Sequence, residues 1–118
     1  MGRRLLRVMI LVWAGLCAGS VLAAPDTEYA LYSASSALDG KPVTLKLNTF
    51  SGDSWFFDGR QWQPMAESGN KNFYDMPSYQ LKLTDSAQGL VIFRFSVVNG
   101  STWVYTSGGW EFIDEPER

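Results

Sequence analysis

Two aspartates on predicted turns, Asp53 and Asp58, are the residues of this 118-residue chain whose type and spacing best suit chemistry. Two carboxyl groups on neighbouring turns can divide the general-acid and general-base roles between them. The same region recurs 48 residues later with Ser101 and Thr106 in their places, so the pair does not belong to the repeated frame. Because turn aspartates usually hydrogen-bond their own backbone, we expect these two to be structural and the protein not to be an enzyme.

Other catalytic and metal-dependent chemistries have less support. The chain has no histidine, which is the usual proton shuttle and the commonest ligand of transition metals. A nucleophilic serine would therefore need a lysine or a carboxylate as its base. Four aspartates could act as calcium ligands, but their spacing is not that of a known calcium loop. They are Asp39, Asp53, Asp58 and Asp85. We expect no cofactor and no metal, and a small hydrolase is the least favoured function.

Aromatic side chains are a better indication of function. Five of them fit the inward-facing pattern of the predicted strands poorly: Phe73, Tyr74, Tyr32, Phe56 and Phe112. The first four are the candidate binding aromatics. Exposed aromatic rings stack on sugar rings or anchor protein partners. Phe73 and Tyr74 lie in a polar joint, residues 66–78, and the alternative is that they pin this joint to the core.

A frame of one glycine and two tryptophans occurs twice and organises the chain. Gly52, Trp55 and Trp62 form the first copy. The second copy, 48 residues later, consists of Gly100, Trp103 and Trp110. Each glycine is expected to end a three-residue hairpin loop, and Asp58-Gly59 is a strong signal for a two-residue hairpin loop.

These loops predict the strand register. Leu47 would then face Trp55, Trp55 would face Trp62, and Phe95 would face Trp103. All four tryptophans of the frame would point into the core, and Arg94 would point outward.

Alternating apolar residues complete the predicted fold. Each of two repeats, residues 29–65 and 79–113, reads as a four-stranded antiparallel meander. One meander cannot bury its apolar face alone. The predicted fold is all-β, with two sequence-related four-stranded meanders packed as a small sandwich or flattened barrel around a twofold axis; blade-like stacking is the alternative.

The frame resembles a repeat of small exported bacterial proteins of uncharacterised function. Asn48–Trp55 followed by Trp62-Gln63-Pro64 matches the pattern [DN]-T-x-[ST]-G-x-x-W and W-x-P. It is similar, more loosely, to the threonine-glycine-x-tryptophan signature of propeller blades in quinoprotein dehydrogenases. The second copy departs further from the pattern. The resemblance implies hairpin geometry and no activity, and no dehydrogenase cofactor residue can be mapped onto this chain.

Residues 1–23 have the pattern of a secretory signal peptide. Three arginines precede an uncharged apolar run at residues 8–19, and small residues lead to a cleavage site after Ala23. The run is shorter than the roughly 20 residues that span a bilayer, so we expect cleavage and not a retained anchor. Residues 24–118 are then a single exported β domain, periplasmic or secreted, without stable membrane insertion.

Charge narrows the partners of this domain. Residues 24–118 hold seven basic and twelve acidic residues, a net charge of −5, which argues against nucleic acid. The one cysteine, Cys17, leaves with the signal peptide. We expect an exported, non-catalytic small β protein that acts as a protein-binding or assembly module in the cell envelope. The alternative is a glycan or peptidoglycan binder that uses exposed aromatics.

Overall fold

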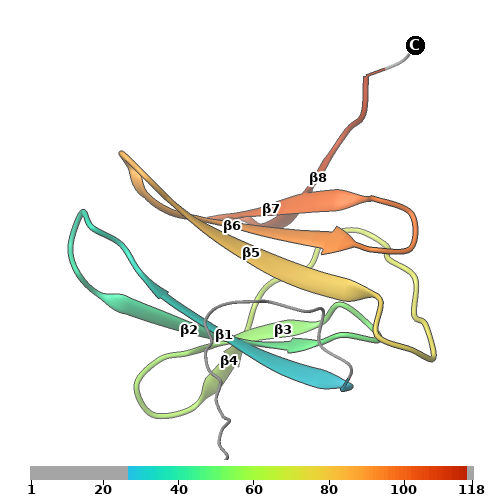
Figure 1. Ribbon diagram of the computed structural model, residues 1–118, viewed down its shortest axis with the longest axis horizontal. Coiled ribbons are helices and arrows are strands. Elements are labelled where there is room, and N and C mark those ends of the chain that lie inside the picture. The colour runs from blue at the N-terminus through green and yellow to red at the C-terminus, as the bar shows by residue number, and fades with distance from the viewer. Residues whose placement is uncertain (1–26, 117–118) are drawn as a thin grey trace, which may run out of the picture.

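The computed structural model describes residues 27–116, so the predicted signal peptide lies outside the described residues. The first sheet has the order β1 (Tyr29–Ser35), β2 (Pro42–Asn48), β3 (Ser54–Phe57) and β4 (Trp62–Pro64). The second has the order β5 (Tyr79–Ser86), β6 (Gly89–Ser96), β7 (Thr102–Thr106) and β8 (Gly109–Ile113). Every pairing is antiparallel, and the two sheets pack as a sandwich (Figure 1), which confirms the predicted fold class. Within residues 27–116 no helix is long and apolar enough to cross a membrane.

The loop after β2 is one residue longer than predicted. The Asn48 amide donates to the Asp53 carbonyl at 2.8 Å, and the Gly52 amide donates to the Asn48 carbonyl at 2.7 Å. The Asn48 side-chain oxygen accepts the amides of Phe50 and Ser51, which closes a four-residue loop over 49–52. Gly52 has φ +81°, a left-handed conformation that favours glycine.

The second repeat folds its loop in the same way. The Ser96 amide donates to the Ser101 carbonyl, and the Gly100 amide donates to the Ser96 carbonyl, both at 2.8 Å. The Ser96 hydroxyl takes the capping role of the Asn48 side chain. The second hairpin of each repeat, β2–β3 and β6–β7, therefore has equivalent geometry despite different loop sequences.

The longer loop shifts the predicted pairing by one residue. Lys46, not Leu47, lies opposite Trp55. Arg94, not Phe95, lies opposite Trp103. Since side chains alternate between the faces of a strand, the one-residue shift moves Trp55 to the opposite face from Leu47, and it moves Trp103 to the opposite face from Phe95.

The pairing of Trp55 with Trp62 is also wrong. A four-residue loop over 58–61 joins β3 to β4, so Trp62 lies opposite Phe57 and Trp55 lies opposite Pro64. The Asp58 carboxylate accepts the amides of two residues in this loop and stabilises its longer form. The shift is by two residues, so Trp55 and Trp62 remain on the same face.

Each sheet has two distinct faces. We name them after the tryptophans and the leucines of the first sheet, and the equivalent faces of the second sheet keep the same names. The tryptophan face of the first sheet carries Tyr29, Leu31, Lys46, Trp55, Phe57 and Trp62. The tryptophan face of the second sheet carries the equivalents Tyr79, Leu81, Arg94, Trp103, Tyr105 and Trp110. The opposite leucine face carries Leu45, Leu47, Ser54 and Met65 in the first sheet, and Phe93, Phe95, Thr102 and Ile113 in the second.

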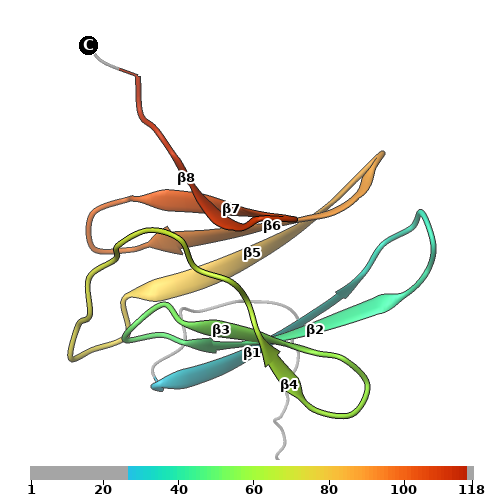
Figure 2. The ribbon, with the colours of Figure 1, turned by 180° about the vertical axis from the view of Figure 1, so that it is seen from behind.

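The two sheets lie one above the other in both views (Figures 1 and 2). The leucine face of the first sheet packs on the tryptophan face of the second. The buried core joins Leu45, Leu47 and Met65 to Tyr79, Leu81, Trp103 and Trp110. Because unlike faces meet, the predicted twofold axis between the halves is wrong, and the repeats stack in the same sense, like successive blades. Of the four tryptophans predicted to be inward, Trp103 and Trp110 are buried, whereas Trp55 and Trp62 are partly exposed on the outer face.

The two equivalent tryptophans Trp55 and Trp103 should therefore differ in their effect on stability. Trp103 is 6% exposed. We expect Trp103→Ala to lower the free energy of unfolding by about 3–5 kcal/mol. We expect Trp55→Ala to lower it by roughly 1 kcal/mol, since its ring is already partly hydrated. Guanidinium denaturation followed by circular dichroism measures both, and equal losses would contradict the face assignment.

Candidate functional site

Arg94 is fully buried where the two sheets meet, against the prediction that it points outward. Its guanidinium lies over the rings of Trp103 and Trp110, with Cζ at 4.3 and 4.7 Å from the ring centroids. Nη1 and Nη2 donate to the two carboxylate oxygens of Glu67 at 2.7 and 2.9 Å. Nη1 also donates to the Gly52 carbonyl at 3.0 Å. Only the planar fork of arginine can make this bidentate pair and stack on indoles at once.

The segment that supplies Glu67 connects the sheets physically. After β4 the chain crosses to the second sheet (Figure 2), where Glu67 forms a parallel bridge with Trp110 on β8. The Trp110 amide donates to the Ala66 carbonyl at 3.0 Å, and its indole Nε1 donates to the Ser54 hydroxyl at 2.9 Å. Lys71 then binds the Asp53 carboxylate at 2.8 Å. The segment thus extends the edge of the second sheet while it remains tied to the first.

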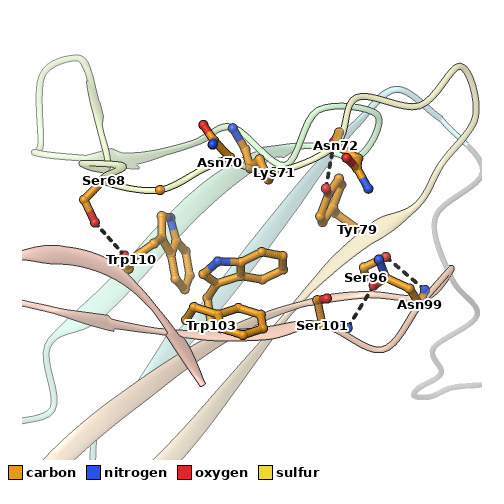
Figure 3. A pocket seen from close by; sticks show the side chains of 12 residues that line it. Ser68, Asn70, Lys71, Asn72, Tyr79, Ser96, Asn99, Ser101, Trp103 and Trp110 are labelled. Atoms are coloured by element: carbon orange, nitrogen blue, oxygen red, sulfur yellow. Dashed lines mark hydrogen bonds between the residues drawn. The ribbon is translucent and has the colours of Figure 1, made fainter. Parts of the chain in front are cut away.

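A pocket of about 390 Å³ lies between this segment and the second sheet (Figure 3). The indoles of Trp103 and Trp110 line it on one side. Its polar lining includes the side chains of Asn70, Asn72, Asn99 and Ser101. Aromatic faces beside amide and hydroxyl groups suit a small, neutral, polar ligand.

Tyr79 closes the inner side of this pocket. Its hydroxyl donates to the Asn72 carbonyl at 2.7 Å. Burial, together with the neighbouring Tyr74, raises the pKa of the Tyr79 hydroxyl above its ordinary value. Tyr79 therefore stays protonated at neutral pH and remains a hydrogen-bond donor that holds the 68–72 segment in place.

The tryptophan face of the first sheet repeats the arginine cluster in an open form. Lys46 Nζ lies 4.8 and 4.9 Å from the ring centroids of Trp55 and Trp62. The rings of Tyr29 and Phe57 pack beside these indoles and are 52% and 46% exposed. No carboxylate in the described part of the chain forms an ion pair with Lys46. An exposed aromatic surface of this kind is typical of a binding face.

The four predicted binding aromatics do not form one site. Phe73 and Phe56 are 70% and 37% exposed. Tyr32 and Tyr74 pack against the core instead, and the Tyr74 ring lies 5.9 Å from the ring of Tyr79. Tyr74 thus does what the alternative interpretation expected and pins the joint to the core, whereas Phe73 projects from the same joint.

Sequence reasoning missed the cluster on the outer face of the first sheet. It placed Trp55 and Trp62 in the core and gave Lys46 no role. The signal was present in the frame, because a cation precedes the first tryptophan by nine residues in both repeats, as Lys46 and as Arg94. The error came from the length of the loop after β2, which the Asn48 cap makes one residue longer than predicted.

Asp53 and Asp58 serve as structural carboxylates. Hydrogen bonds from the Gln61 amide, the Gln63 side chain and the Arg60 amide lower the pKa of Asp58 below its ordinary value. Partial burial alone would raise the pKa of Asp53, but the hydrogen bond and charge of Lys71, with smaller effects, lower it overall. Within residues 27–116 no three acidic or thiol side chains gather in a group that could hold a metal ion.

Removing the acid of the buried ion pair should destabilise the sandwich. Glu67→Gln leaves the Arg94 guanidinium buried without a counter-charge, and we expect a loss of about 2–3 kcal/mol in the free energy of unfolding. The matched control is Glu115→Gln, because Glu115 occupies the equivalent place of the second repeat and is exposed. Guanidinium denaturation should show a change within about 0.5 kcal/mol for the control. Similar losses in both variants would show that the buried pair is not what holds the sheets together.

Acid should weaken the fold in part through Asp58. Since the folded-state pKa of Asp58 lies below the ordinary value of 3.8, its ionised form stabilises the fold above that pH. This stabilisation disappears as the pH falls through the folded-state pKa. We expect the melting temperature of Asp58→Asn to fall less steeply than that of the parent between about pH 6 and pH 2. Parallel curves for the two proteins would exclude this contribution.

Comparison with known proteins assigns no family to the chain. No protein-family model matches it, and neither the curated proteins nor the solved structures contain a match. The aromatic face of the first sheet and the pocket beside the second sheet are therefore the basis for a functional proposal.

Proposed function

We propose that this chain is an exported, non-catalytic protein-binding or assembly module of the cell envelope, and that the tryptophan face of its first sheet is the binding surface. The observation that carries the proposal is the Lys46 cluster, in which one ammonium group lies between two partly exposed indoles. The pattern of residues 1–23 supports export. The hydrogen bonds of Asp58 within its own loop and the ion pair of Asp53 with Lys71 support a non-catalytic role.

The internal contact supports a polypeptide as the ligand of this surface. In the second sheet the equivalent face receives a polypeptide surface, and its cation receives a carboxylate and a backbone carbonyl. Aromatic residues anchored on a rigid sheet lose little conformational freedom on binding, and they are enriched among the residues that dominate interface energies. Lys46 adds a preference for a partner that brings a negative charge to the centre of the interface.

Glycan binding is a second candidate, favoured by the pocket of Figure 3. Its indoles offer flat faces for a sugar ring, and Asn70 and Asn99 offer amide donors and acceptors. This site is separate in position from the Lys46 cluster, since it lies against the second sheet. The two candidates therefore respond to different substitutions.

Adjacent phenylalanines provide a matched test. Phe57 lies on the tryptophan face, and Phe56 lies on the leucine face of the same strand. A photo-cross-linking amino acid at position 57 should give a discrete protein adduct in cells, and the same group at position 56 should give none. Lys46→Glu should weaken capture at position 57 by at least about tenfold.

Two outcomes would count against this proposal. Equal capture at positions 56 and 57 would show that the tryptophan face is not the binding surface. Retention on peptidoglycan that is lost on Asn99→Ala but kept on Lys46→Glu would favour the glycan candidate instead.

A further inference from the structure

We propose that the partner on the tryptophan face is a second copy of this chain, stacked head to tail. The leucine face of one copy's second sheet would cover the tryptophan face of the next copy's first sheet. This inference rests on the proposed use of the tryptophan face as a protein-binding surface. It goes further by naming the partner, the face that the partner contributes and the order of the copies.

The internal sandwich is the template for this contact. Inside the chain, a leucine face meets a tryptophan face. The two sheet faces that the described residues leave uncovered are again one of each kind, because the sheets stack in the same sense. A second copy, stacked on the first copy with the geometry that relates the two repeats inside the chain, would therefore bring matching surfaces together.

The tryptophan side of the contact is preserved in both repeats. Lys46 lies opposite Trp55 as Arg94 lies opposite Trp103. The cation-to-ring distances are 4.8 and 4.9 Å in the first repeat and 4.3 and 4.7 Å in the second. The first sheet thus presents the arrangement that the second sheet uses to hold its neighbour.

The leucine side is preserved as well. Phe93, Phe95 and Ile113 occupy the places of Leu45, Leu47 and Met65, so the outer face of the second sheet keeps its apolar centre. Phe93 and Phe95 are partly exposed, and Ile113 is 38% exposed. Inside the chain the Ser54 hydroxyl accepts the Trp110 indole, and Thr102, which takes the place of Ser54 in the second repeat, also carries a hydroxyl. The Thr102 hydroxyl would be available to the Trp62 indole of the next copy.

The charges match in the same register. Glu67, which neutralises Arg94, is followed 48 residues later by Glu115. Glu115 is exposed on the tail that leaves β8 and points away from both sheets (Figure 1). In the stacked geometry this tail would lie along β4 of the next copy, as the segment after β4 lies along β8 inside the chain. Glu115 would then reach Lys46, which has no acidic partner among residues 27–116.

A contact of this kind does not close on itself between two copies. Each copy uses different faces at its two ends, so the contact is heterologous. Repetition of a heterologous contact gives a ring when the rotation between copies closes, and a filament when it does not. The inference therefore predicts assemblies larger than a dimer.

Charge reversal at the two ends tests the proposal. The mass of the exported protein, measured by sedimentation velocity between about 1 μM and 1 mM, should rise beyond a dimer with concentration. Lys46→Glu and Glu115→Lys should each weaken association by at least about tenfold, because each places like charges in the contact. Glu115 lies in the exposed tail, so its reversal leaves the folded core unchanged, which circular dichroism verifies.

An equal mixture of the two variants is the decisive sample. Where a K46E copy follows an E115K copy, the introduced acid at position 46 meets the introduced base at position 115. At the next contact between copies, the native pair of Glu115 and Lys46 forms. Head-to-tail stacking should therefore return in the mixture and grow beyond a dimer. A pair of tryptophan faces meeting each other would stop at a dimer and would not respond to Glu115→Lys.

Each remaining outcome overturns the proposal in a distinguishable way. A parent protein that stays monomeric to about 1 mM excludes self-stacking. If the cross-linker at position 57 then captures a different protein in cells, the proposed binding face stands and the inference alone fails. If position 57 captures nothing and the protein stays monomeric, both the inference and the proposed function fail.

Discussion

The burial of one guanidinium between two indoles is the interaction on which the rest of the structure depends. A charge this deep in the interior is tolerated only when a counter-charge and further acceptors reach it. Glu67 and the Gly52 carbonyl meet that demand for Arg94. To do so, the chain after β4 must cross to the second sheet, and the loop after β2 must lie against it. The ion pair thus specifies how the two sheets are stacked.

The same constraint explains why unlike faces meet. Arg94 shares its face with Trp103 and Trp110, and only the first repeat contributes Glu67 to that face. A twofold arrangement of the two tryptophan faces would bring the cations Lys46 and Arg94 toward each other, and a twofold arrangement of the two leucine faces would leave Arg94 and its indoles on the outside. Stacking in one sense avoids this repulsion, but it leaves the Lys46 cluster of the first sheet uncovered. The exposed aromatic surface is thus a consequence of how the repeats satisfy their charges.

The hairpin frame could be predicted from sequence, and the orientation of its side chains could not. The two meanders, their antiparallel order and the glycines of their loops follow from local signals such as Gly52 and Gly100. The side-chain caps of Asn48 and Ser96 each favour one more loop residue. That single residue reverses every face assignment in β3 and β7, because side chains alternate with period two. The candidate aromatics share this error, since the selection of Tyr32 depends on the wrong inward pattern.

By itself, the sequence determined that the chain is a repeated β protein with a glycine and tryptophan frame, and that it has no histidine. These properties depend on composition and on neighbours a few residues apart. The tertiary structure alone decided that Arg94 is buried, that Lys46 is open and that the segment after β4 joins the second sheet. Those outcomes depend on which faces meet across about fifty residues of chain, and that choice is made by charge neutralisation and packing between the repeats.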